Sequence, residues 1–320
     1  MTPLLEIDDL VVDYVSADRT VRALDSAALT VSAGETIGIV GESGSGKSTL
    51  GAAIGGLLPG AARVVSGSVR VDGADVTTLR PKQLRALRRE QLGFVFQEPI
   101  GSLDPTMRVG KQVELALRGW GTRADVLAHL ERVKLTDPER VARCYPHQLS
   151  GGMAQRVAIA MAMAGRPEIL VADEPTAALD SQVRDDVLDV IFALAAESGT
   201  TILWLSHDLP AVAKRCSRVV VMYGGGVVES GAASAVLAEP RHPYTKALVR
   251  AVPAAVADGE RLTSIPGQPP VLTGSAPGCV FAPRCPDVLA SCTEQRPPLV
   301  SAAGRDVLCH LAEQTVEAGR

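Results

Sequence analysis

The sequence is poor in aromatic side chains, which make up 3% of its 320 residues. Its interior must therefore be filled mainly by Ala, Val, Leu and Gly, and a hydrophobic content of 46% is enough for a sizeable core. The sequence also lacks an excess of basic charge, because its formal net charge is −4. A face that neutralises nucleic-acid phosphates is not expected on such a chain, so we expect no nucleic-acid partner.

Targeting and membrane-spanning segments are also missing. Acidic residues occur from Glu6 onward and no basic stretch precedes an apolar one, so we expect no secretory signal. The run Val157–Gly165 is too short to span a bilayer, and the run 51–62 contains Gly and Pro. Any part in transport therefore requires other chains that are embedded in the membrane.

Short apolar runs alternate with helical stretches up to about residue 250, which predicts an α/β fold with a largely parallel sheet. We expect strands at Thr36–Val40, Phe94–Phe96, Ile169–Ala172, Ile202–Leu205 and Val219–Met222. We expect helices that begin near Gly46, Ser181 and Leu209, and further helical stretches at Val109–Leu117, Ala124–Val133 and Met153–Ala164.

The domain organisation follows from a change in composition. Nine of the 21 prolines lie between Pro253 and Pro298, which predicts a loop-rich extension in place of the βα alternation. We therefore expect a nucleotide-binding domain at 1–252, with a helical subdomain at about 98–165, and a C-terminal extension at 253–320.

A phosphate-binding loop follows the first of these strands. Residues 41–48 read GESGSGKS, between the strand and a helical stretch, and this is the full eight-position P-loop pattern in its required context. Its glycines let backbone N–H groups converge on phosphate oxygens at the start of the helix. We expect Lys47 to reach the β- and γ-phosphates of a nucleotide and Ser48 to bind Mg²⁺.

Two further strand ends carry polar groups. Asp173 and Glu174 end a buried strand, at the edge of a parallel sheet where ligands bind. Asp173 is suited to hold Mg²⁺, and Glu174 to take a proton from an attacking water. His207 follows the next strand, where it can contact the γ-phosphate. A single histidine is more often a surface residue, but three strand ends with complementary groups favour the functional interpretation.

Residues 149–152, LSGG, precede a helix and offer donors at its N-terminus. Taken alone, they are equally compatible with a phosphate site and with a plain helix cap. The set of P-loop, Gln97, LSGGM at 149–153, LVADEP at 170–175, Asp180 and His207 resembles ATP-binding cassette transporters, and the resemblance covers residues 4 to about 250.

The resemblance implies roles for individual residues. Ser150 and Gly152 would complete the nucleotide site of an opposing subunit, and Asp180 would lie in the loop that crosses this dimer. Gln97 would touch Mg²⁺ or water. Tyr14 would stack on adenine, although a strand residue facing the core is a serious alternative. The expected nucleotide-binding residues are Tyr14, Gly41, Glu42, Ser43, Gly44, Ser45, Gly46, Lys47, Ser48, Thr49, Gln97, Ser150, Gly152, Asp180 and His207. The expected catalytic residues are Lys47, Glu174 and His207, and the expected Mg²⁺ ligands are Ser48, Gln97 and Asp173.

Within this family the chain resembles the ATPase subunits of oligopeptide and dipeptide importers, through GESGSGKSTL at 41–50, RHPYTKAL at 241–248 and GCVFAPRCP at 278–286. The resemblance implies a peripheral ATPase on the cytoplasmic face of the cell membrane. Its partners would be two permease subunits, a second ABC ATPase subunit, expected as a heterodimer, and an extracellular substrate-binding protein. A nickel or other small-solute importer ATPase and a soluble non-transport ABC ATPase are the alternatives.

Four of the six cysteines, Cys279, Cys285, Cys292 and Cys309, lie in the extension with gaps of five, six and sixteen residues. A reducing compartment favours metal over disulfides, and no close pair typical of a zinc ribbon is present. These spacings, and the resemblance of the tail to peptide-importer ATPases, favour a [4Fe–4S] cluster. Zinc, or cysteines packed as small apolar groups, remain alternatives. Cys144 and Cys216 are expected to be small apolar residues.

Overall fold

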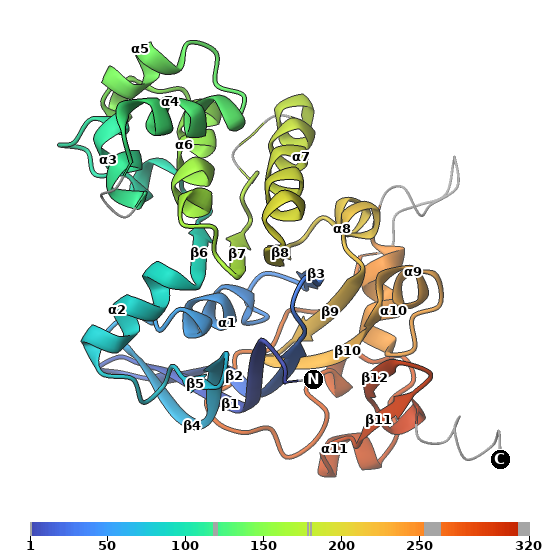
Figure 1. Cartoon of the computed structure of the whole chain (residues 1–320). Helices are drawn as coiled ribbons and strands as arrows, with labels where there is room; N and C mark the ends of the chain where they lie inside the picture. The colour runs from blue at the N-terminus through green and yellow to red at the C-terminus, as the bar shows by residue number, and fades with distance from the viewer. Residues whose placement is uncertain (1, 118–120, 178, 180, 253–263, 313–320) are drawn as a thin grey trace. The chain divides into compact units, whose positions relative to one another are not determined.

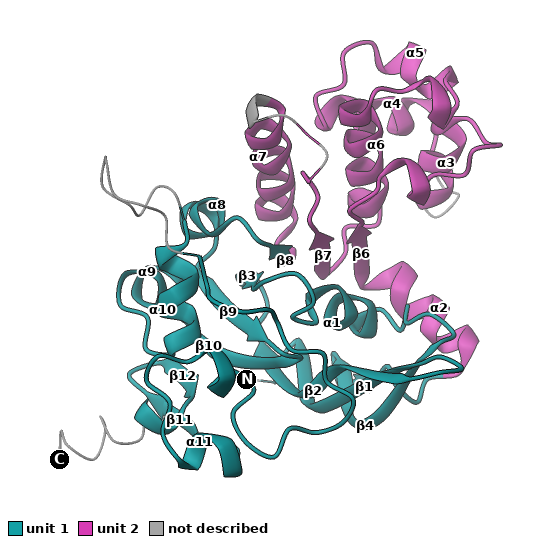
Figure 2. Ribbon diagram, turned by 180° about the vertical axis from the view of Figure 1, so that it is seen from behind, with its two compact units in different colours: residues 1–79, 205–320 teal, residues 80–204 magenta. Residues whose placement is uncertain are grey.

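A computed structural model of the chain describes residues 2–117, 121–177, 179, 181–252 and 264–312 (Figure 1). The chain forms two compact units, one of Met1–Leu79 with Leu205–Arg320 and the other of Arg80–Trp204 (Figure 2). β8 (Thr201–Ser206) carries the chain from the second unit into the first.

The first unit contains a four-stranded antiparallel sheet in the order β2-β1-β4-β5. Its strands are β1 (Leu5–Val15), β2 (Thr20–Val31), β4 (Ala62–Val71) and β5 (Ala74–Asp75). β1 is an inner strand, because Leu5 pairs with Val31 on one side and with Val71 on the other. Its apolar side chains Leu5 and Leu10 are fully buried, so this sheet contributes one wall of the core of the unit.

The same unit also contains strands in the order β11-β12-β10-β9-β3, with β3 and β9 parallel and the other pairs antiparallel. These strands are β3 (Thr36–Val40), β9 (Arg218–Tyr223), β10 (Gly226–Ala232), β11 (Leu299–Ala302) and β12 (Arg305–Leu308). The helices of the unit are α1 (Lys47–Ile54), α8 (Leu209–Arg215), α9 (Ala233–Ala238), α10 (Pro243–Arg250), the 3₁₀ turn η4 (Ala282–Arg284) and α11 (Ser291–Glu294). Because β3 and β9 are parallel, the loops that follow them leave the sheet at the same edge.

The second unit is mainly helical. Its elements are α2 (Pro81–Glu90), β6 (Leu92–Val95), η1 (Ile100–Ser102), α3 (Val109–Ala116), α4 (Arg123–Arg132), α5 (Pro138–Arg143), η2 (Pro146–Gln148), α6 (Gly151–Ala164), β7 (Ile169–Asp173) and α7 (Ser181–Ser198). β6 and β7 are parallel, with Val95 paired with Ala172. The low aromatic content is visible in α6, whose buried face includes the small side chains Ala154 and Ala160.

The five strands expected from the sequence are all present, within one or two residues at their ends. The four-stranded antiparallel sheet of the first unit was not expected. The extension was expected to be loop-rich, yet its strands β11 and β12 form a hairpin whose second strand pairs with β10. The expected domain boundary after residue 252 adjoins residues 253–263, which lie outside the described part of the chain. None of the helices in the described residues is both long and apolar enough to cross a membrane.

Candidate nucleotide-binding site

The P-loop joins β3 to α1 in the first unit. Gly46 precedes the first residue of α1 and has a φ of 100°, where a Cβ atom would lie 2.6 Å from the carbonyl oxygen of Ala23. Gly44 has a φ of 79° and nothing within 4 Å of the position of a Cβ. These two positions therefore need glycine for their backbone conformation, and the loop stays open at Gly44.

Lys47 is buried, with a relative exposure of 7%. Its Nζ donates hydrogen bonds to the carbonyl oxygens of Gly41 at 2.7 Å and Glu42 at 3.0 Å, and lies 3.4 Å from Ser45 Oγ. These contacts hold the ammonium group against the loop. Gly46 provides no side-chain cap for α1, so the N-terminal N–H groups of the helix remain suited to a phosphate.

Four other expected residues, Ser43, Ser48, Tyr14 and Thr49, lie in or beside the same loop. Ser43 and Ser48 are exposed to solvent. The hydroxyl of Tyr14, on β1, lies 3.4 Å from Oγ1 of Thr49, in the first turn of α1. The structure thus brings Tyr14 to the P-loop. The donor set of Lys47, Ser48 and an uncapped helix N-terminus fits a Mg²⁺-bound nucleotide.

His207 also belongs to the first unit and directly follows β8. Its side chain is exposed, and the next residue, Asp208, begins α8 by accepting a hydrogen bond from the backbone N–H of Ala211 at 3.0 Å. The N-cap of α8 therefore belongs to Asp208 and leaves the His207 side chain accessible to a ligand.

In the second unit, Gln97, Asp173 and Glu174 lie at one edge of the β6–β7 pair, because both parallel strands end there. Gln97 is exposed and follows β6 by two residues. Glu174 has a φ of 43°, in the left-handed region that a non-glycine residue adopts at a cost. Such strained conformations are concentrated at functional sites. The structure therefore brings the two carboxylates and the glutamine together.

Ser150 begins α6, and its Oγ accepts a hydrogen bond from the backbone N–H of Met153 at 3.3 Å. Ser150 and Gly151 are exposed, and a Cβ on Gly151 would have nothing within 4 Å. A Cβ on Gly152 would touch only Val183, at 3.5 Å. LSGG is thus a capped helix N-terminus whose glycines leave its backbone approachable. Asp180, expected to cross a dimer, lies outside the described residues.

The expected site residues therefore form two groups, one in each unit. The P-loop residues, Tyr14 and His207 belong to the first unit, and Gln97, Ser150, Gly152, Asp173 and Glu174 belong to the second.

Sequence reasoning missed the residues that support the P-loop from the C-terminal half. Tyr244 Oη accepts a hydrogen bond from the backbone N–H of Glu42 at 2.8 Å, and Arg284 forms an ion pair with the Glu42 carboxylate. The motif at 241–248 contains Tyr244, so it could have indicated that this residue has a role at the nucleotide site. Burial raises the pKa of Tyr244, and the Glu42 carboxylate raises the pKa of Arg284.

The motif at 241–248 begins α10, with Pro243 in the first turn. The cap is His242, whose Nδ1 accepts a hydrogen bond from the Tyr244 N–H at 3.0 Å. Burial lowers the pKa of His242 to about 3. The neutral ring therefore acts as the acceptor at the helix N-terminus.

The four cysteines of the extension are free thiols. Burial raises the pKa of Cys279 to about 11, and Cys292 and Cys309 add to this effect. The thiols are thus close enough to influence one another. The described residues nevertheless contain no group of three or more His, Cys, Asp or Glu side chains arranged to hold a metal ion. The expected [4Fe–4S] cluster therefore receives no support from the structure. Cys216 is buried as expected.

Comparisons with known proteins agree with these features. Residues 24–177 match the model of the ABC transporter family, and residues 228–292 match the family described as oligopeptide/dipeptide transporter, C-terminal region. The chain is 41% identical over 312 residues to the oligopeptide transport ATP-binding protein OppD of Salmonella typhimurium, covering 96% of this chain and 93% of that protein. It is 40% identical over 314 residues to the dipeptide transport ATP-binding protein DppD of Escherichia coli, covering 96% of both.

Among solved structures, the fold is similar to a dimeric post-hydrolysis state of the ATP-binding cassette MJ0796 bound to ADP and Pi. The TM-score is 0.64 at 32% sequence identity, and the similarity covers 72% of this chain and 98% of that one. The part of the chain without a counterpart in this cassette therefore amounts to about a quarter of its length.

Proposed function

This chain belongs to the ABC transporter family as an ATP-binding and ATP-hydrolysing subunit, and we propose that the transporter it energises imports short peptides. The observation that carries the proposal is the match of residues 228–292 to the C-terminal region of oligopeptide/dipeptide transporters. The OppD and DppD relatives, similar over almost the whole chain, support the same cargo.

ATP would bind with its phosphates on the P-loop. Lys47 neutralises the β- and γ-phosphates, and the N–H groups at the start of α1 donate to them. Tyr14, whose hydroxyl lies 3.4 Å from Oγ1 of Thr49, would stack on the adenine. Ser48, Gln97 and Asp173 would hold Mg²⁺, which shields the phosphate charge.

Glu174 would accept the proton of the attacking water, and His207 would position that water against the γ-phosphate. The left-handed backbone at Glu174 supports this role, because strain of this kind accompanies preorganised functional groups.

A second cassette would complete the site. The exposed Ser150 and the small residues behind it offer an approachable helix N-terminus, which would face the nucleotide of the opposing subunit. Asp180 would contribute to the same dimer. We further propose a heterodimer that docks on two permease subunits at the cytoplasmic face of the membrane, together with an extracellular substrate-binding protein. The helical insert at roughly 98–148 would dock on the permease subunits and pass the nucleotide state to them through Gln97.

A [4Fe–4S] cluster on Cys279, Cys285, Cys292 and Cys309 belongs to the same proposal. Neighbouring thiols of the set contribute to the raised pKa values of Cys279, Cys285 and Cys309, and four thiols are a suitable donor set by chemistry. They would have to turn toward a common centre, since the described side chains do not form a metal-holding group. Anaerobic purification with iron and sulfide analysis checks it, and a colourless protein with zinc or without metal would contradict it.

The main test is peptide uptake in cells that lack this subunit. Wild-type protein should restore uptake of labelled di- to oligopeptides. Glu174→Gln should bind ATP but lower turnover by about 10²–10⁴-fold, because it removes a positioned base. Glu168→Gln is a matched control, since Glu168 is exposed and precedes β7 at its opposite end. Peptide uptake that is unaffected by deleting the subunit would reject the proposed cargo.

A further inference from the structure

The second residue of the P-loop is held by the extension. Arg284, in η4, donates from Nη1 to Glu42 Oε2 at 2.7 Å and from Nη2 to Glu42 Oε1 at 3.1 Å. This is a two-pronged ion pair between residues 242 positions apart in the sequence. The Arg284 side chain is 6% exposed and that of Glu42 is 24% exposed. A paired and mostly buried guanidinium of this kind fixes the geometry of its carboxylate.

Arg284 is itself held in place by several partners. Its Nε donates to the carbonyl oxygen of Pro266 at 2.7 Å, and its Nη1 also lies 3.2 Å from Tyr223 Oη. The rings of Tyr223 and Tyr244 lie 4.5 Å apart between centroids, and Phe281 packs against both. The guanidinium is therefore a rigid part of the extension and not a mobile surface group.

The backbone of Glu42 is held as firmly as its side chain. Its N–H donates to Tyr244 Oη at 2.8 Å, and its carbonyl oxygen accepts from Lys47 Nζ at 3.0 Å. Arg284 of the extension and Tyr244 of α10 thus restrain Glu42, the loop residue that contacts Lys47. Preorganisation of a binding loop raises affinity, because less conformational freedom is lost when the ligand binds.

The charge of Glu42 matters as well. A carboxylate in a phosphate-binding loop repels a polyphosphate, and Arg284 compensates this charge at hydrogen-bonding distance. Loss of Arg284 would leave the negative charge beside the nucleotide. Repulsion should weaken ATP binding more than ADP binding, because ATP carries one more negative charge.

We propose that Arg284 is a positioning residue for the nucleotide: it fixes and neutralises Glu42, so that ATP affinity depends on the folded state of the C-terminal extension. This inference rests on the proposed binding of ATP at the P-loop. It assigns to the extension a function in the ATP cycle that is separate from any metal cluster.

The test measures the Kd of fluorescent ATP and ADP analogues on the full-length chain. Arg284→Gln should raise the Kd for ATP by about tenfold and the Kd for ADP by less, which lies within the usual range of coupling between sites. Glu42→Gln, which removes the repelling charge, should raise the Kd for ATP by less than Arg284→Gln does. Arg284→Gln introduced into the Glu42→Gln background should then have little further effect.

Two variants make the test specific. Arg296→Gln removes another arginine of the extension, whose contacts are with Asp25, Ser26 and Ala276 and not with a P-loop residue, and it should leave both Kd values unchanged. Arg284→Lys keeps the positive charge without the two-pronged geometry, so it should preserve the ratio of ATP to ADP affinity. This variant keeps the inference testable if Arg284→Gln fails to fold. Equal Kd values for Arg284→Gln and Arg296→Gln, or a loss that Glu42→Gln does not relieve, would overturn the inference. Wild-type protein that binds no ATP would instead reject the proposed function.

Discussion

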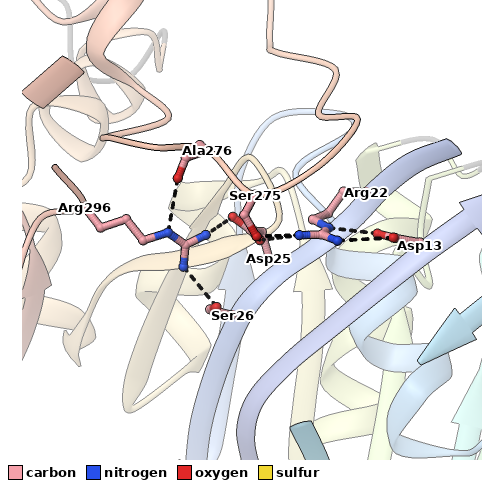
Figure 3. Close-up of polar contacts among 7 residues, drawn as sticks. All are labelled: Asp13, Arg22, Asp25, Ser26, Ser275, Ala276 and Arg296. Atoms are coloured by element: carbon pink, nitrogen blue, oxygen red, sulfur yellow. Dashed lines mark hydrogen bonds and ion pairs between the residues drawn. The ribbon is translucent and has the colours of Figure 1, made fainter. Parts of the chain in front are cut away.

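Two of the ion pairs that attach the extension to the rest of the first unit, those of Arg305 and Arg296, differ in burial. Nη2 of Arg305, on β12, lies 2.7 Å from Oε1 of Glu229, on β10, and the two side chains are 7% and 0% exposed. Arg296 pairs with Asp25 on β2, where the arginine is 43% exposed and the aspartate 3% exposed (Figure 3). The same kind of ion pair is therefore buried in one place and lies at the edge of solvent in the other.

The partners of the two carboxylates differ in a second way. Glu229 also accepts hydrogen bonds from the backbone N–H groups of Arg241 and His242, at 3.0 and 2.9 Å. Asp25 has side-chain partners besides Arg296, namely Arg22 at 3.3 Å and Ser275 at 3.2 Å (Figure 3). Loss of Arg296 therefore leaves Asp25 a cationic partner, Arg22, whereas loss of Arg305 leaves Glu229 only neutral donors within the described part of the chain. Burial and alternative partners, not the pair itself, decide what such a contact contributes to stability.

The largest effect is expected from the buried pair. Arg305→Leu should lower the free energy of unfolding by about 3–5 kcal/mol, because it leaves the charge of Glu229 buried without its counter-ion. Glu229→Gln in the Arg305→Leu background should recover part of this loss, since it removes the buried charge and the amide oxygen still accepts from one of the backbone N–H groups of Arg241 and His242. Denaturant unfolding of the single and double variants measures both effects. If Arg305→Leu cost no more than Arg296→Gln, the role of burial would be refuted.

The sequence predicted the P-loop and its neighbouring strands because these features are local. Residues 41–48 form one uninterrupted motif, and β3 is a continuous apolar run. The antiparallel sheet was missed, because β1 contains acidic residues and irregular pairing, and β4 is largely exposed over its first half. Neither strand shows the regular alternation on which strand prediction depends.

The candidate site shows the same division between local and long-range information. Lys47, Asp173 and Glu174 were recognisable because each stands in a short motif next to a strand. The contact between Glu42 and Arg284 has no such signal, since the two residues are brought together only by the folding of the extension. A pair of residues so distant in a single sequence cannot be found from local pattern.

An intermediate effect on the free energy of unfolding is expected from the protonation of His242. This residue is buried, and its backbone N–H donates to Glu229 of the buried pair. Burial lowers the pKa of His242 to about 3 in the folded chain, and an exposed histidine titrates near about 6.5. A depressed pKa means that the unfolded chain binds the proton first, so stability is retained above about pH 6.5 and falls as the pH is lowered toward 3. At pH 5 this group should cost about 2 kcal/mol relative to pH 8.

The matched variant is His242→Asn, because asparagine also caps a helix N-terminus but does not titrate. Its unfolding free energy should fall less than that of the wild type between pH 8 and pH 5. Unfolding curves at several pH values measure the difference. Parallel pH profiles for the two proteins would show that His242 is not buried in its neutral form.

The smallest effect is expected from the pair at the edge of solvent. Arg296→Gln should lower the free energy of unfolding by no more than about 1 kcal/mol, because the arginine is 43% exposed and is screened by water. Asp25 is buried, but Arg22 and Ser275 continue to compensate it. High salt should reduce the effect further, and in an Asp25→Asn background Arg296→Gln should cost still less, since the charge it compensates is gone. If Arg296→Gln lowered the free energy of unfolding as much as Arg305→Leu does, Arg22 would not compensate Asp25. The additional partners of a buried carboxylate would then contribute little to stability.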